Sequence, residues 1–119
     1  MNDEKFLRSF ALLEAALAEC DADPKNLLRL AALAKTFENM FEYVWNHFKR
    51  EADHAGFEVY SPRDALRCAA QLKRIDDLEL WNQFLNARNL SVHDYIGVDN
   101  TTALPLVHRF RDEVKRLKD

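Results

Sequence analysis

The sequence predicts an all-α protein, folded as an antiparallel up-and-down bundle of four main helices plus one short helix. Three observations support this. Only two glycines and three prolines interrupt the 119 residues, apolar residues recur every three or four positions, and no segment alternates apolar and polar residues as a half-buried strand does. Hydrophobic residues make up 48% of the chain, enough for a core without disulfides or metals. We therefore expect one domain over residues 1–119.

The first helix is predicted to end near Cys20, because its apolar residues form one stripe at helical spacing. The segment 21–24 then closes it. Asp23 is expected to cap the next helix, with Pro24 in the first turn, where the missing N–H of proline costs nothing. The stripe consists of Phe6, Phe10, Leu13 and Leu17.

The second helix is predicted to be the longest, at about 28 to 30 residues. It should end at segment 54–56, His-Ala-Gly, where glycine supplies a stop. Its seam is typical of a helix packed in an antiparallel bundle. The seam positions are Leu27, Leu30, Ala34, Phe37, Phe41, Val44 and Phe48.

Three more helices follow. The Ser-Pro-Arg-Asp segment 61–64 opens a short helix that should end near Lys73, with serine as its cap. Asp76 or Asp77 starts the fourth helix, and the fifth begins after segment 99–102. The positions expected on the apolar sides of these two helices are Leu80, Trp81, Phe84 and Leu85 in the fourth, and Leu104, Val107, Phe110 or Arg111, Val114 and Leu117 in the fifth.

The charge of the chain is uneven. Residues 1–60 carry a net charge of −4 and residues 61–119 a net charge of +1, so an anionic ligand should approach the second half. Cys20 and Cys68 match no zinc or redox spacing, and we expect both to be reduced structural residues. The apolar runs are far shorter than the roughly 20 residues of a membrane span, and the N-terminus has no leader pattern. A cytoplasmic protein is expected.

Several kinds of catalytic site are excluded by the sequence. It has no Gly-rich phosphate loop and no G-x-S-x-G or H-E-x-x-H motif, and it lacks the sheet and the Gly-Ser turn that a nucleotidyl transfer centre would need. Glu51-x-x-His54 with His47 copies half of a di-iron helix motif, but the second copy is missing. We interpret these residues as a solvated helix end and expect no metal and no cofactor.

The segment 88–95, Arg-Asn-Leu-Ser-Val-His-Asp-Tyr, gathers polar side chains where surface helices prefer better helix formers. In an ideal helix Arg88 and His93 lie about 140° apart around the axis, so they could grip one small anion only if the helix bends or two chains cooperate. Asn89 and His93 are an i, i+4 pair, so the amide could orient the imidazole. The residues alone leave two interpretations open: a buried polar contact between helices, with Tyr95 stacked on the bundle, or a functional site.

The same residues carry a resemblance. Arg88-x4-His93-x-Tyr95 resembles the signature of HEPN domains, and the wider chain resembles one branch of them, the nucleotidyltransferase substrate-binding proteins. Thr36 and Asn46 depart from the pattern of this family, which usually carries basic residues there. The other matching places are Phe37-Glu38, Phe41-Glu42 and Trp45 on the long helix, the opening at 61–64, and Leu80-Trp81 before Arg88-Asn89-Leu90.

The resemblance implies a small helical subunit, a homodimer, that serves a separately encoded minimal nucleotidyltransferase and contacts its substrate, with RNA or a nucleotide as a possible ligand. Other HEPN proteins are similar in motif but act as metal-independent ribonuclease toxins, silenced when the nucleotidyltransferase adenylylates the motif tyrosine. On that alternative His93 would be the general acid or base and Arg88 the contact to the phosphorane, with Asn89 in support and Tyr95 as the modified residue. Because cleavage needs both an acid and a base, two motifs would have to face one cleft across a dimer.

Overall fold

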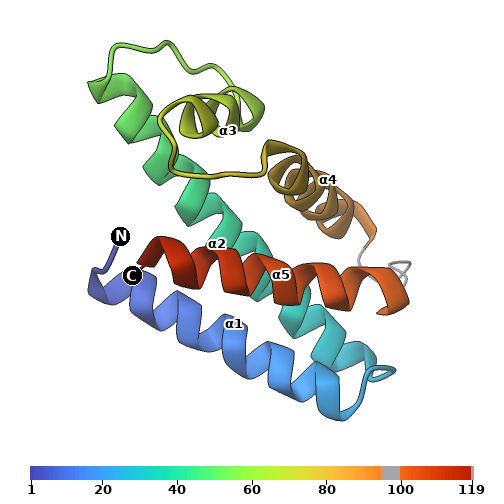
Figure 1. Ribbon diagram of the computed structural model, residues 1–119. Helices are drawn as coiled ribbons and strands as arrows, with labels where there is room; N and C mark the ends of the chain where they lie inside the picture. The colour runs from blue at the N-terminus through green and yellow to red at the C-terminus, as the bar shows by residue number, and fades with distance from the viewer. Residues whose placement is uncertain (95–99, 119) are drawn as a thin grey trace.

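The computed structural model describes residues 1–94 and 100–118, with side chains for 1–89 and 103–118. Five helices and no strand lie within this part of the chain, which confirms the predicted all-α fold (Figure 1). Four are long, and α3, with ten residues, is the short one. The helices are α1 Glu4–Ala22, α2 Leu27–His54, α3 Pro62–Gln71, α4 Leu78–Asp94 and α5 Asn100–Lys118.

Helix α2 organises the bundle, since α1, α3 and α4 all pack against it. Helix α1 covers the N-terminal part of α2, and the Tyr43 hydroxyl of α2 donates a hydrogen bond to Asp3 at the start of α1. The last turns of α2 extend past α1, and α3 packs there (Figure 1). Helices α1 and α5 run antiparallel side by side, with His108 Nε2 of α5 2.9 Å from Asp21 Oδ1 of α1.

The cap of α2 corrects one prediction. Asp23 does not start α2 but ends α1, because its backbone N–H donates to the Glu19 carbonyl at 3.2 Å. The N-cap of α2 is Asn26, whose Oδ1 accepts from the backbone N–H of Arg29 at 3.1 Å. Pro24 therefore lies in the turn between the helices and not in a first helical turn. Asp23 and Asn26 can both cap a helix, and Asn26, the one directly before α2, is its N-cap in the structure.

The predicted seam of α2 is correct from Phe37 onward. Phe37, Phe41, Val44 and Phe48 are buried, whereas Leu30 and Ala34 are only half-buried and Leu27 is 59% exposed. Leu27 is the first residue of α2. Helical spacing predicts which stripe of a helix is apolar, but it does not determine whether a residue of the first turn is covered.

The starts of α3 and α4 agree with the prediction. Ser61 Oγ accepts from the Asp64 N–H at 3.2 Å and so caps α3. Asp64 Oδ2 reaches back to the Tyr60 N–H at 3.1 Å, one residue before the N–H that a capping box would use. Asp77 Oδ1 accepts from the Leu80 N–H at 3.0 Å and so caps α4.

We expect Ser61→Ala to lower the free energy of unfolding by about 1 kcal/mol, because the variant leaves the Asp64 N–H without its hydroxyl acceptor. Chemical denaturation of both proteins measures the difference. Ser61→Asp is the matched control, since aspartate is an equally good N-cap and should retain most of the stability. Equal stability of Ser61→Ala and the wild type would contradict a role for this cap.

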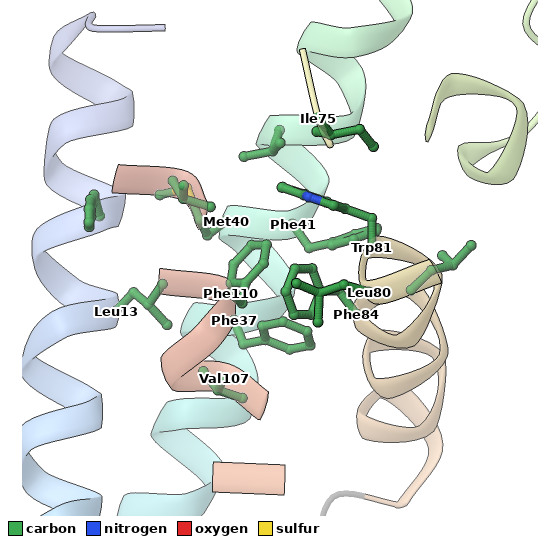
Figure 2. Close-up of a cluster of buried hydrophobic side chains, with 14 of the residues drawn as sticks. Leu13, Phe37, Met40, Phe41, Ile75, Leu80, Trp81, Phe84, Val107 and Phe110 are labelled. Atoms are coloured by element: carbon green, nitrogen blue, oxygen red, sulfur yellow. The ribbon is translucent and has the colours of Figure 1, made fainter. Parts of the chain in front are cut away.

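The core is one cluster of buried side chains drawn from every helix, centred on aromatic rings (Figure 2). Phe110 of α5 is fully buried and packs edge-on against Phe37 of α2 and Phe84 of α4, with ring centroids 4.9 and 5.2 Å apart. Trp81 of α4 lies against Phe48, Phe84 and Phe110. Edge-to-face pairs of this kind add to the free energy gained from area burial. The aromatic core therefore fixes α4, which carries the candidate site, against α2 and α5.

Both cysteines are buried and free, as predicted. Burial raises the pKa of the Cys20 thiol, and its Sγ donates to the Arg29 carbonyl at 3.3 Å. In the described part of the chain, no helix is both long and apolar enough to cross a bilayer.

Candidate functional site

Arg88 lies on the face of α4 that is turned toward α2. Its Nη2 donates to Glu42 Oε2 of α2 at 2.9 Å, and its Nη1 donates to Oδ1 of the adjacent Asn89 at 3.1 Å. The Arg88 side chain is 26% exposed and the Glu42 side chain 46% exposed, so the ion pair lies at the surface. The structure thus brings Arg88 and Asn89 together, as two of the four predicted site residues.

Glu42 holds a second group as well. The same Oε2 atom accepts from Trp45 Nε1 at 3.0 Å, and Asn46 Nδ2 donates to the Glu42 carbonyl at 2.8 Å. Glu42 and Trp45 are three residues apart on α2, a spacing that puts two side chains on the same side of a helix. Glu42, Trp45 and Arg88 therefore form one unit, called here the α2–α4 triad, in which one carboxylate oxygen joins an indole on α2 to a guanidinium on α4.

The side chain of His93 and the whole of Tyr95 lie outside the described part of the structure. The expected Asn89–His93 contact therefore stays a prediction. The backbone of α4 is helical as far as Asp94. Residues 88 and 93 of one straight helix lie about 140° apart around its axis. We therefore still expect these two positions to face different directions within one chain.

A comparison with protein-family models finds a match to "Nucleotidyltransferase substrate binding protein like" over residues 2–119. The chain belongs to this family. No curated protein matches it in a sequence comparison.

The family-like residues of the sequence divide into two groups in the structure. Phe37 and Phe41 are buried in the core, and Ser61 caps α3, so these three stabilise the fold. Glu42 and Trp45 lie instead in the α2–α4 triad with Arg88. All of these positions stand out in the sequence, but the pairing of Glu42 with Arg88 does not. The repeated Phe-Glu pattern on α2 was the available signal, since a glutamate next to each core phenylalanine points to a second, polar face.

A second unit of the same composition joins α4 to α5. Glu113 Oε1 accepts from Trp81 Nε1 at 3.2 Å and from Arg116 Nη2 at 3.0 Å. The hydrogen bond to Glu113 raises the pKa of Arg116, which also lies 3.5 Å from Asp76. Trp81, Glu113 and Arg116, called the α4–α5 triad, differ from the first unit in having a fully buried tryptophan.

The half di-iron motif is a structural ion-pair cluster. Glu51 Oε1 lies 3.2 Å from His47 Nε2 and accepts from Arg74 Nε at 3.1 Å, which ties α2 to the segment after α3. His54 is exposed. Among the residues that the structure describes, no three His, Cys, Asp or Glu side chains are grouped so that they could hold a metal ion.

His47 should make stability depend on pH. Burial lowers the pKa of His47 below its ordinary value of 6.5, although the charge of Glu51 opposes this. The unfolded chain then takes up a proton more readily than the folded protein as the pH falls below about 6.5, so protonation favours unfolding. We expect the wild type to lose more stability than His47→Gln between about pH 7.5 and pH 5.5. Urea denaturation at both pH values measures this, and equal losses would contradict it. His54→Gln, at an exposed position of the same helix, is the matched comparison.

Proposed function

We propose that this chain is the HEPN-type substrate-binding subunit of a separately encoded minimal nucleotidyltransferase. Residues 1–119 would form one HEPN-like helical domain and act as a homodimer. The observation that carries the proposal is the family match over residues 2–119. The partner would supply the metal-dependent transfer chemistry, and this chain would supply surface that binds the partner and its nucleotide or RNA target.

The α2–α4 triad is the part of this surface that we assign to the anionic ligand. A guanidinium can form paired hydrogen bonds to phosphate, and Arg88 is the basic residue of the resembling motif. Its place beside Asn89 at a partly exposed position of α4 supports this assignment. His93 and Tyr95 follow on the same helix and the segment after it, and we propose that they complete the contact.

Co-purification tests this proposal. A tagged form of the chain is expressed together with a minimal nucleotidyltransferase encoded next to it, to be identified by a Gly-Ser and paired-aspartate pattern. A stable complex with two copies of this chain is expected, and its mass measured in solution gives the composition. A chain that elutes alone at every salt concentration would contradict the partner role.

The alternative function is that of a metal-independent endoribonuclease toxin in a HEPN and nucleotidyltransferase pair. His93 would serve as the general base or acid and Arg88 would stabilise the phosphorane, with the two motifs facing each other across the dimer. The nucleotidyltransferase would silence the toxin by adenylylating Tyr95. The observation in favour of this alternative is that Arg88 lies at the surface, where the phosphate of an RNA could reach it.

The ribonuclease alternative predicts RNA cleavage in EDTA by the purified chain. Arg88→Ala should lower the rate by about 10²- to 10³-fold, the usual effect of removing one donor to transition-state charge. Cleavage products on denaturing gels measure this, with His93→Ala as the paired variant. Intact RNA with the wild type would remove the enzyme function under those conditions. The mass of Tyr95 peptides from the co-expressed protein shows whether a nucleotide has been added.

A further inference from the structure

The α2–α4 triad points to a role for Glu42 that the Phe-Glu pattern of the sequence did not predict. We propose that Glu42 is a positioning residue that orients the Arg88 guanidinium for its ligand, an inference that rests on the proposed function. Its Oε2 atom lies 2.9 Å from Arg88 Nη2 and 3.0 Å from Trp45 Nε1. The carboxylate therefore holds the guanidinium in one place relative to α2.

Orientation matters because an arginine side chain has many rotamers. If the guanidinium is not held in place, ligand binding must restrict the side chain to one rotamer, and the entropy lost in doing so weakens the affinity. A charge-assisted hydrogen bond to Glu42 orders the guanidinium beforehand, and the bond from Arg88 Nη1 to Asn89 Oδ1 holds it at a second point. The oriented fork is then ready before the ligand arrives.

Trp45 holds Glu42 in turn. The indole is half-buried and packs against the hydrophobic core, so its N–H is a fixed donor. The Glu42 carboxylate thus accepts from a fixed donor on its own helix. The same oxygen then holds Arg88 of α4 in place. The orientation of Arg88 consequently depends on how α2 and α4 pack.

The α4–α5 triad provides a matched control within the same chain. Glu113 likewise accepts from one indole and one guanidinium through a single oxygen, but it holds Arg116 and not Arg88. Substitution of Glu113 removes the same kinds of hydrogen bond at a place to which no binding role is assigned. A loss that comes only from weaker helix packing would appear in both variants.

The first test uses the free protein and the indole N–H signals of its two tryptophans in ¹H–¹⁵N NMR spectra. Glu42→Gln should shift the Trp45 signal and leave the Trp81 signal in place, and Glu113→Gln should do the reverse. Arg88→Ala should also shift the Trp45 signal, because both groups share one oxygen. An unmoved Trp45 signal in both Glu42→Gln and Arg88→Ala would overturn the inference.

The second test is a double-mutant cycle for the affinity of the co-purified complex toward a short single-stranded RNA, which serves as the probe for the anionic ligand. Arg88→Ala and Glu42→Ala should each weaken binding by about tenfold, and the double variant should bind no more weakly than Arg88→Ala alone. Glu42→Gln keeps the acceptor oxygen and should recover part of the loss. Glu113→Ala should bind like the wild type. Thermal unfolding of each variant confirms that it is folded.

The outcomes separate the two proposals. Full affinity in Glu42→Ala, together with weaker binding in Arg88→Ala, would overturn the positioning role and leave the proposed function intact. Additive losses in the double variant would also overturn it, because Glu42 would then act independently of Arg88. Full affinity in Arg88→Ala would contradict the binding role of the triad itself.

Discussion

Phe110→Ala should lower the free energy of unfolding by about 3 to 5 kcal/mol, because the surrounding rings can fill the resulting cavity only in part. Phe110 is fully buried at the point where three helices meet, and it contacts Phe37 and Phe41 of α2 and Trp81 and Phe84 of α4. No other ring of the core has as many aromatic neighbours among the described residues.

Urea denaturation monitored by circular dichroism measures the change. Leu28→Ala is the control, since this leucine is 81% exposed and its loss should change stability by no more than about 0.5 kcal/mol. Phe110→Leu should fall between the two, because it keeps part of the buried volume. A cost of less than about 1 kcal/mol for Phe110→Ala would mean that the three helices do not depend on this ring.

Trp81→Ala should have an effect of similar size, about 3 to 5 kcal/mol. Trp81 fills the space between Phe48, Phe84 and Phe110, and its Nε1 donates to Glu113 of α5. The variant removes both the packing and the hydrogen bond. It should also loosen α4, and with it the helix that carries the candidate site.

Trp81→Phe separates the two contributions. It keeps an aromatic ring and loses the indole N–H, so we expect a smaller cost of about 1 to 2 kcal/mol. Denaturation curves of both variants give the comparison. Equal costs for Trp81→Ala and Trp81→Phe would mean that the hydrogen bond to Glu113, and not the packing, accounts for the stability of this contact.

Much of the fold was predictable because it depends on local chemistry. The apolar seam of α2, the serine cap of α3 and the aspartate cap of α4 follow from the spacing and type of nearby residues. The failures arose where local chemistry leaves more than one choice open. At the α1–α2 turn, Asp23 and Asn26 are both good caps, and only the three-dimensional turn decides between them. Helical periodicity also did not predict that Leu27 is exposed.

The candidate site was predictable only in part. Arg88 and Asn89 were predictable from the motif, but Glu42 lies 46 residues before Arg88 in the chain. The contact between Glu42 and Arg88 depends on the relative position of α2 and α4 along their axes, and the aromatic core sets that position. The local sequence around either residue does not encode it. The predictions for His93 and Tyr95 stay predictions, because they fall outside the described side chains.

The antiparallel pairing of α1 with α5 has a practical consequence for protein engineering. Asn2 Nδ2 donates to the Lys118 carbonyl at 3.1 Å, so both chain ends lie at the same corner, far from the C-terminal end of α4 (Figure 1). A short peptide could therefore close the backbone into a ring, and new ends could be opened at turn 23–26 without cutting any helix. For the same reason, a fluorescent or affinity label fused at either end should leave the Arg88 surface accessible to a bound partner.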